Sequence, residues 1–181
     1  MIVSAHDGFP RWVNSGADFI EVDIRRTHEG AFVLSHDELK AGQRHTTLGE
    51  VLKATTGRMG VQLDLKEPGY ELDVVRQALD EHPPERVVVT TPFMESIHTI
   101  KAAFPEVKAG LTRQFIEHAD ADFISLDQRY ATEEALGFGM PVWIWTVDDQ
   151  RQMWRLIRDQ RVAGIITNRP KLALWIRTAR L

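Results

Sequence analysis

Cysteine is absent from the 181-residue sequence, and this absence excludes disulfide bonds, thiolate zinc sites and cysteine nucleophiles. Long apolar runs are also missing, since none approaches the roughly 20 residues that a membrane-spanning helix needs. The opening residues, MIVSAH, are too short and too weakly charged to form a signal peptide. We therefore expect a cytoplasmic protein without a membrane span.

An excess of positive charge is lacking as well, because 22 Lys and Arg residues are set against 26 Asp and Glu residues, for a net charge of −4. Without a basic tract, the sequence gives no support for a nucleic-acid partner. Hydrophobic residues make up 43% and charged residues 27% of the chain, which is ordinary for a globular protein. Since no linker or low-complexity segment interrupts the sequence, we expect one domain over residues 1–181.

Eight short apolar or β-branched runs alternate with helix-like stretches, which is typical of an α/β protein. The expected strands are 2–5, 19–23, 61–66, 86–91, 107–111, 123–127, 142–147 and 164–167, and the clearest expected helices are 48–55, 70–82, 94–103 and 149–159. Parallel strands joined by helices predict a single-domain (β/α)8 TIM barrel. Because such barrels typically need roughly 250 residues, we expect a compact barrel with shortened helices, above all between residues 5 and 19 and between residues 111 and 123.

Helix ends are marked by capping and breaking residues. Asp73 predicts the start of the helix within 70–82, and Pro83 with Pro84 predicts its end, because proline cannot continue a helix. Thr132 with Glu134 predicts the start of a further helix.

The segment FIEVDIRRTHEGAFVLSHD, residues 19–37, carries an unusual pair of acids. Glu21 and Asp23 occupy alternate positions of a strand, so their side chains share one face. The flanking pattern indicates that the opposite face is covered too, which directs both carboxylates into a sheltered interior. There they repel each other unless a cation or protons lie between them. The segment then turns and returns through an apolar run to His36, which delivers an imidazole near the pair.

Further polar residues stand at the expected C-terminal ends of strands, where barrels of this kind place their catalytic groups. Asp64 would join Glu21 and Asp23 to give three oxygen ligands, which suit Mg²⁺ or Ca²⁺. These three acids are therefore the predicted metal ligands.

Two histidines and a lysine would surround the same centre. His6 and His36 are candidate acid and base groups, since imidazole titrates near neutrality. Lys66 would neutralise phosphate charge in a transition state. A divalent cation, a lysine and two histidines favour the cleavage of a phosphoester.

Each of these assignments has a plainer structural alternative. The acid pair could form ion pairs with Arg25, Arg26 or Lys66. His6 could be only a hydrogen-bonded residue at a strand end, and Trp145 could belong either to the core or to a pocket wall.

A family resemblance rests on seven segments, which occur in the order AH, GADFIEVDIRRTHEG, VLSHD, TLGEVLK, VQLDLKEP, VWIWTVDDQ and GIITNRP. Together they span nearly the whole chain and resemble the glycerophosphodiester phosphodiesterase family. The resemblance implies a barrel enzyme of lipid metabolism that uses a divalent cation to hydrolyse glycerophosphodiesters to glycerol 3-phosphate and an alcohol. It further implies that His6 and His36 are the acid/base pair and that Glu21 and Asp23 are metal ligands. Lys66 and Trp145 would then contact the phosphate and line the pocket.

Four departures from the family pattern accompany the resemblance. Asp7 stands where the family usually has arginine, and it would repel phosphate unless it joins the metal shell or Arg11 takes the place of that arginine. The proline-glutamate-asparagine-threonine segment that normally follows is missing. Asp64 replaces the usual glutamate, and Asp148 replaces the asparagine that commonly ends the tryptophan-threonine-valine motif.

Three functions follow from these observations. The first is the metal-dependent hydrolysis of a small-molecule glycerophosphodiester. The second is the binding of a phosphorylated ligand by a barrel without turnover, and the third is a related phospholipid-cleaving lyase that releases a cyclic phosphate.

Overall fold

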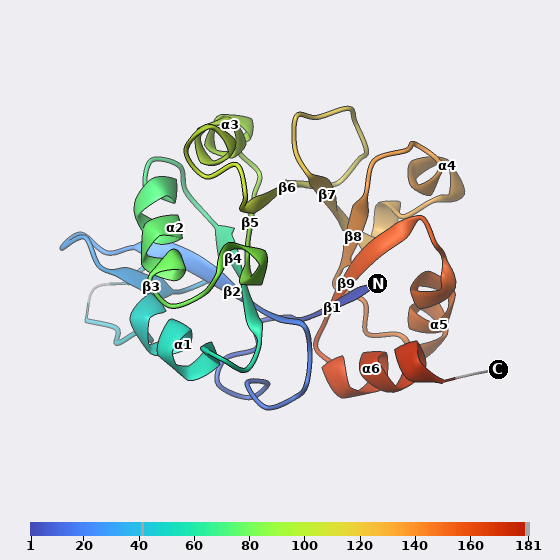
Figure 1. Ribbon diagram of the computed structural model, residues 1–181, viewed down its shortest axis with the longest axis horizontal. Helices are drawn as coiled ribbons and strands as arrows, with labels where there is room; N and C mark the ends of the chain where they lie inside the picture. Colours follow the sequence, from blue (N-terminus) through green and yellow to red (C-terminus); the bar gives the residue numbers. More distant parts are fainter. Residues whose placement is uncertain (41, 180–181) are drawn as a thin grey trace.

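The computed structural model describes residues 1–40 and 42–179, which form a closed barrel flanked by helices (Figure 1). Neighbouring strands pair in the order β1-β9-β8-β7-β6-β5-β4-β2, and β1 also pairs with β2, which closes the ring. All eight of these strands are parallel to their neighbours in the ring. They are β1 (Ile2–Ala5), β2 (Phe19–Arg26), β4 (Gly60–Leu65), β5 (Val87–Thr91), β6 (Lys108–Arg113), β7 (Phe123–Asp127), β8 (Val142–Trp145) and β9 (Val162–Thr167). The predicted TIM barrel is confirmed. Residues 41, 180 and 181 of the predicted domain lie outside the described part.

A ninth strand, β3 (Phe32–Leu34), lies outside this ring and pairs antiparallel with the end of β2. Ile24, Arg25 and Arg26 of β2 are opposite Leu34, Val33 and Phe32. This pairing explains why β2 continues three residues beyond the predicted end at residue 23. It also returns the chain to the C-terminal end of the barrel.

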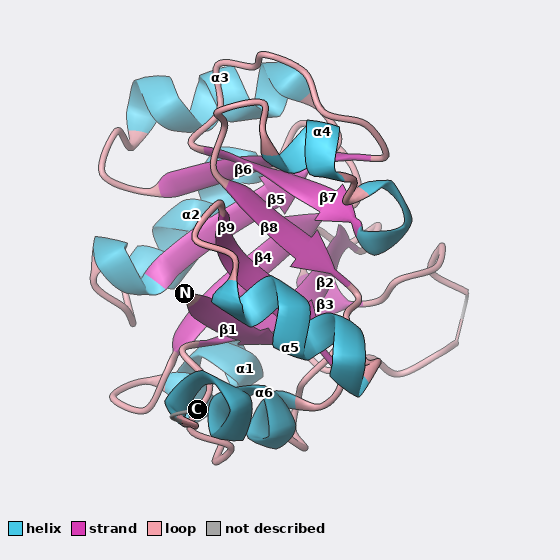
Figure 2. Cartoon of the chain, turned by 90° about the vertical axis from the view of Figure 1, so that its right-hand side faces the viewer, coloured by secondary structure: helices cyan, strands magenta, loops and turns pink. Residues whose placement is uncertain are grey.

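The described residues form six α-helices, which lie outside the barrel (Figures 1 and 2). They are α1 (Leu48–Thr55), α2 (Glu71–Leu79), α3 (Met94–Ala103), α4 (Glu133–Leu136), α5 (Gln150–Arg158) and α6 (Pro170–Thr178), with 3-10 turns η1 (Pro84–Arg86) and η2 (Gln128–Tyr130). Turns and loops alone connect β1 to β2 and β6 to β7, which confirms where the barrel was expected to be shortened. Within residues 1–40 and 42–179, no helix combines the length and apolar character that crossing a membrane requires.

Helix α2 differs at both ends from its prediction. It begins at Glu71 rather than at Asp73, and the Glu71 carboxylate accepts a hydrogen bond of 2.6 Å from the Gly69 N–H. It ends at Leu79, before the two prolines. Helix α4, by contrast, starts as predicted, since Thr132 Oγ1 accepts a hydrogen bond from the Ala135 N–H.

The two faces of β2 lead to different cores. Ile20, Val22 and Ile24 are fully buried in the large apolar layer between the strands and the helices. The alternate residues face the barrel interior, where Phe19 packs in a second apolar cluster with residues of β5, β7, β8 and β9. The predicted alternation along β2 is therefore correct, and it leaves Glu21 and Asp23 inside the barrel.

Three aromatic residues, Phe19, Phe123 and Trp143, form what we call the aromatic floor of the barrel. Their rings contact one another at centroid distances of 5.9 Å for Phe19–Trp143 and 4.6 Å for Phe123–Trp143. Each lies opposite a glycine of the adjacent strand, in the pairs Phe19–Gly60, Phe123–Gly110 and Trp143–Gly164. A Cβ at any of these glycines would lie less than 3 Å from the ring it faces. The missing side chains therefore make room for the rings, which fill the N-terminal end of the barrel.

Candidate active site

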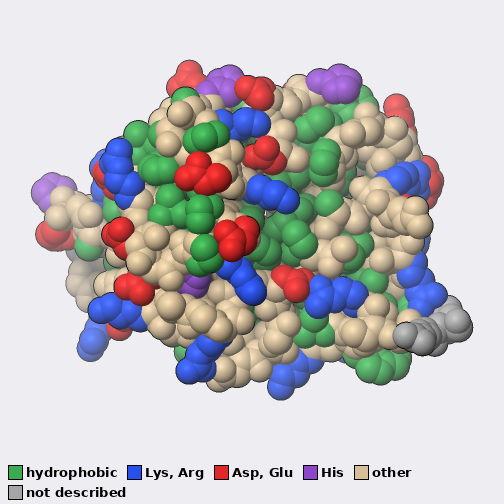
Figure 3. Space-filling model, in the orientation of Figure 1, with side chains coloured by type: hydrophobic (Ala, Val, Ile, Leu, Met, Phe, Trp, Pro, Cys, Tyr) green, Lys and Arg blue, Asp and Glu red, His purple; other side chains and the backbone are tan. Residues whose placement is uncertain are grey.

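The strand ends opposite the aromatic floor surround a cavity of about 120 Å³. All seven residues predicted for the site line it, namely His6, Glu21, Asp23, His36, Asp64, Lys66 and Trp145. Sequence positions 6 and 145 thus meet in one cavity because β1 and β8 both pair with β9. Over the face of the molecule that Figure 3 shows, acidic and basic side chains are interspersed.

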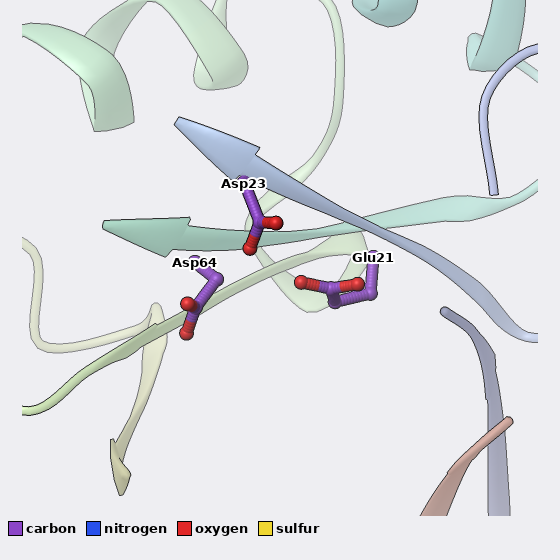
Figure 4. A group of neighbouring side chains, drawn as sticks. All are labelled: Glu21, Asp23 and Asp64. Carbon is purple, nitrogen blue, oxygen red and sulfur yellow. The ribbon is translucent and has the colours of Figure 1, made fainter. Parts of the chain in front are cut away.

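The three acids converge from two adjacent strands. Glu21 and Asp23 project from β2 and Asp64 projects from β4 toward the same space (Figure 4). Asp23 and Asp64 are directly opposite each other in the parallel pairing. One carboxylate oxygen from each of the three acids lies within 4.8 Å of the others. This spacing allows the three groups to share one small cation.

Burial sets the electrostatics of Glu21, which is only 5% exposed. Desolvation raises the pKa of its carboxyl group well above the usual range, and the charges of Asp23 and Asp64 raise it further. The backbone N–H of Asp7 donates a hydrogen bond of 2.9 Å to Glu21 Oε2 and opposes this effect in part. The hydrogen bond from Asp7 therefore only partly stabilises the ionised carboxylate of Glu21.

Lys66 is the cation that contacts the cluster. Its Nζ lies 2.7 Å from Asp23 Oδ1 and 2.5 Å from Asp64 Oδ2. Burial alone would lower the pKa of this ammonium group, but the charges of Asp64 and Asp23 raise it above its ordinary value. Lys66 therefore remains charged and neutralises one of the three acids.

The arginines proposed as alternative partners of the acids are engaged elsewhere. Arg25 pairs with Glu67 and donates a hydrogen bond of 3.1 Å to the carbonyl oxygen of His36. The Arg26 guanidinium lies over the ring of Tyr70, 5.5 Å from its centroid. Of the three alternative partners, Lys66 is therefore the one that contacts the acids, and both arginines contact other groups.

The donor set fits a hard divalent cation. Three carboxylates and one ammonium group leave two negative charges, and the ligand atoms are all oxygens. Asp64 is oriented by Thr90, whose Oγ1 donates a hydrogen bond of 2.6 Å to Asp64 Oδ1. Glu21, Asp23 and Asp64 are therefore the residues that could hold such an ion.

The two histidines reach the cavity from different loops. His6 follows β1, and its Nδ1 lies 3.1 Å from Asn168 Oδ1. His36 follows β3, and its Nδ1 lies 2.9 Å from Asp37 Oδ1. The His36 side chain is 77% exposed, so it stands at the entrance of the cavity. In both rings Nδ1 has a partner, which leaves Nε2 to face a substrate.

Trp145 forms part of the cavity wall. Its Nε1 donates a hydrogen bond of 3.1 Å to the carbonyl oxygen of Ser125, and its ring packs against the cluster that contains the aromatic floor. It thus combines the two roles that the sequence left open, because one part of the side chain is core and another part lines the cavity.

The sequence left two ways to compensate for the missing arginine, in which Asp7 joins the metal ligands or Arg11 takes the place of the arginine. Neither occurs in the described structure. Asp7 is exposed, has a φ of 40° and does not belong to the three-acid cluster. The Arg11 guanidinium stacks on Trp12 at 4.5 Å from the ring centroid and does not line the cavity. The first connection therefore brings no cation to the acids.

Four further residues line the cavity, namely Gln62, Thr112, Ser125 and Ile166. Gln62 and Ser125 are buried polar residues that alternate with apolar residues along β4 and β7, which is the sequence signal that could have identified them. Among the described residues, Gln62 Oε1 and Thr112 Oγ1 are buried and have no hydrogen-bond partner. The inner wall of the cavity therefore combines apolar surface from Ile166 and Trp145 with two unpaired polar atoms.

Comparison with known proteins gives one relative and several structural neighbours, whereas no family model matches the sequence. A glycerophosphodiester phosphodiesterase from Caldanaerobacter subterraneus subsp. tengcongensis is 26% identical, with 90% of this chain and 87% of the relative covered. The alignment runs over 212 positions, more than the 181 residues of this chain. The relative therefore has additional residues within the matched region, which agrees with the shortened connections described above.

Two solved structures share the fold over nearly their whole length. A glycerophosphodiester phosphodiesterase from Parabacteroides distasonis has a TM-score of 0.78 at 18% identity, with 97% of this chain and 96% of that chain covered. A phosphodiesterase from Oleispira antarctica, in complex with the product sn-glycerol-3-phosphate, has a TM-score of 0.81 at 15% identity, with 99% and 97% covered.

Fold and site together define a compact TIM-barrel protein with an acid-lined cavity at the C-terminal ends of its strands. The predicted resemblance to the glycerophosphodiester phosphodiesterases is confirmed by the curated relative, and the structural neighbours of that name share the fold.

Proposed function

We propose that this protein hydrolyses glycerophosphodiesters to glycerol 3-phosphate and an alcohol. The observation that carries the proposal is the single cavity that gathers three carboxylates, a lysine and two histidines in a barrel of this family. The product complex of the Oleispira antarctica phosphodiesterase supports a glycerol phosphate product. The reaction class is phosphoric diester hydrolysis.

Glu21, Asp23 and Asp64 would hold Mg²⁺ or Ca²⁺ in this cavity. When bound, such an ion supplies positive charge that stabilises the phosphoryl oxygens as negative charge develops on them. Lys66 contributes a second positive charge from the same side, since its ammonium group already lies against Asp23 and Asp64.

The two histidines would move the protons. One accepts a proton at Nε2 from the attacking group, a water molecule or a neighbouring hydroxyl of the substrate, while the new O–P bond forms. The other donates a proton to the alcohol oxygen as its bond to phosphorus breaks. His6 and His36 suit these roles because both line the cavity and both have their Nδ1 atoms engaged. Trp145 would shield the reacting phosphate from bulk water.

Two alternatives share this cavity. The exposed Asp7, in place of the family's arginine, favours a barrel that binds a phosphorylated ligand without turnover. A lyase would use a substrate hydroxyl as the attacking group and release a cyclic phosphate.

Phosphorus NMR of the protein with glycerophosphocholine separates the three functions. We expect linear glycerol phosphate to accumulate when Mg²⁺ or Ca²⁺ is present and to stop accumulating when a chelator is added. A persistent cyclic phosphate would instead identify the lyase. No turnover of any glycerophosphodiester with either ion would reject both enzymes and favour the binding protein.

A further inference from the structure

His6, Asn168 and Asp148 form one hydrogen-bonded series across three neighbouring parts of the barrel. His6 follows β1, Asn168 follows β9, and Asp148 lies between β8 and α5. His6 Nδ1 lies 3.1 Å from Asn168 Oδ1, and Asn168 Nδ2 donates a hydrogen bond of 2.7 Å to Asp148 Oδ2. The series connects a cavity-lining imidazole to a carboxylate that lies outside the three-acid cluster.

The chemistry of the three groups fixes the direction of every bond in the series. An ionised carboxylate can only accept hydrogen bonds, so the Asn168 amide must turn its NH₂ group toward Asp148. Its oxygen then faces His6, and because an amide oxygen also only accepts, Nδ1 of His6 must donate. The neutral ring therefore carries its proton at Nδ1, and Nε2 on the opposite edge keeps its lone pair.

Asp148 is itself held firmly in place. Its other carboxylate oxygen, Oδ1, accepts hydrogen bonds of 2.9 Å from Thr167 Oγ1 and 2.8 Å from the Asn168 N–H. The Arg169 guanidinium donates a further bond of 3.1 Å to the Asp148 carbonyl oxygen. The orientation of Asn168 is thus set by a carboxylate that two further donors hold in place, while a third donor holds the Asp148 backbone.

We propose that Asp148 and Asn168 are positioning residues that hold neutral His6 in the Nδ1–H tautomer, with Nε2 ready to accept a proton. Asp148 is one of the departures from the family pattern, which commonly has asparagine at this place. An asparagine could either donate or accept here, so it would not by itself fix the direction of the Asn168 amide. The use of this tautomer in catalysis rests on the proposed function, whereas the tautomer itself does not.

Nitrogen NMR of protein labelled with ¹⁵N-histidine directly tests which tautomer of His6 is present. In the wild-type protein, neutral His6 is expected to carry its proton at Nδ1. In Asp148→Asn, we expect a mixture of the two tautomers. Turnover of glycerophosphocholine should fall about 10- to 100-fold in kcat with little change in KM, as expected for the loss of a group that orients a functional imidazole.

A charge exchange provides the rescue experiment. Asn168→Asp alone places two carboxylates in contact and should also reduce kcat. The double variant Asp148→Asn/Asn168→Asp restores one carboxylate and one amide, with the carboxylate now accepting from His6 Nδ1. We expect it to recover the Nδ1–H tautomer and most of the lost kcat, so that the two substitutions are strongly non-additive.

Asp149→Asn is the matched control, since it removes the adjacent charge without touching the series. Asp149 caps α5 by accepting a hydrogen bond of 2.9 Å from the Gln152 N–H, and asparagine caps a helix equally well. A wild-type His6 protonated at Nε2, or an Asp148→Asn variant with unchanged tautomer and kcat, would overturn the proposal. A protein that hydrolyses no glycerophosphodiester but carries the His6 proton at Nδ1 would reject the proposed function while supporting the positioning of His6.

Discussion

Glu21 combines deep burial with two negatively charged neighbours, so its ionised form is unfavourable unless a cation is present. We predict that Glu21→Gln weakens Mg²⁺ or Ca²⁺ binding by more than about tenfold, because one of three oxygen ligands loses its charge. The same substitution should raise the melting temperature of the metal-free protein, since it removes a buried charge that the other two acids repel.

Isothermal titration calorimetry and thermal unfolding with a chelator measure these two effects. Asp127→Asn is a suitable control, because Asp127 also ends a barrel strand but pairs with Arg129 and does not line the cavity. Unchanged ion affinity in Glu21→Gln would reject the role of Glu21 as a metal ligand.

His36 differs from the acids in being exposed at the cavity entrance. We predict that His36→Ala lowers kcat by about 10²–10⁴-fold, as is typical for the loss of an acid or base group, while ion affinity stays close to that of the wild type. Steady-state kinetics measures the change in kcat, and calorimetry measures the ion affinity. His28→Ala, at an exposed position of the turn between β2 and β3, serves as the control. Retained turnover in His36→Ala would rule out its acid/base role.

The buried His82 connects two helices on the outside of the barrel. Its Nε2 lies 3.1 Å from Thr55 Oγ1 and 3.3 Å from the Leu52 carbonyl oxygen, both in α1, whereas its own backbone follows α2. Burial lowers the pKa of this imidazole below its ordinary value of 6.5. The folded state therefore binds a proton less readily than the unfolded state does.

The sign of the resulting pH dependence follows from linkage. The contribution of His82 to the free energy of unfolding is complete above the unfolded pKa of about 6.5 and is lost as the pH falls below it, at no more than about 1.4 kcal/mol per pH unit. We predict that His82→Asn shows a smaller loss of stability between pH 7.5 and pH 5. Urea unfolding at several pH values measures the difference, with His28→Asn as control. Parallel curves for His82→Asn and the wild type would contradict the prediction.

The strand and helix bounds that the sequence predicts correctly are ones with a strong local signal, whereas several other strand ends differ by one to three residues. The bounds of β1, β7, α1 and α3 follow from short apolar runs and helix signals, and the structure reproduces them. The last three residues of β2 are strand only because they pair with β3. Similarly, α2 starts at Glu71 through a hydrogen bond to the preceding turn rather than at Asp73. Such pairings are set by the fold and have no signature in the local sequence.

The same distinction applies to the site. Glu21, Asp23 and Asp64 could be predicted, because acids at alternate positions of apolar strands are unusual. The connection of His6 to Asp148 through Asn168 could not, since it links residues that are far apart in the chain and adjacent only after the barrel closes. Composition likewise gives no indication of which polar residues remain without a partner in the cavity.

The aromatic floor explains how so short a chain fills a barrel of eight strands. A Cβ at Gly110 would lie 2.3 Å from the Phe123 ring, which is held in place by Trp143. We predict that Gly110→Ala lowers the free energy of unfolding by about 1–3 kcal/mol through overpacking. Gly49→Ala in α1 is the control, because its Cβ would meet Gln77 Nε2 at an ordinary 3.5 Å, and we expect it to stabilise the protein by about 0.5–1 kcal/mol. Denaturant unfolding measures both changes, and equal stability of the two variants would contradict this account of the floor.

The aromatic floor also makes the cavity a dead end. Rings packed against glycine backbones close the barrel at one end, so any molecule that enters between His6 and His36 must leave by the same opening. In the proposed reaction, a released glycerol phosphate would therefore block entry of the next diester until it has left the cavity. Product inhibition by glycerol phosphate should accordingly be competitive with the diester. Because substrate and product share one opening, product release would set an upper limit on kcat.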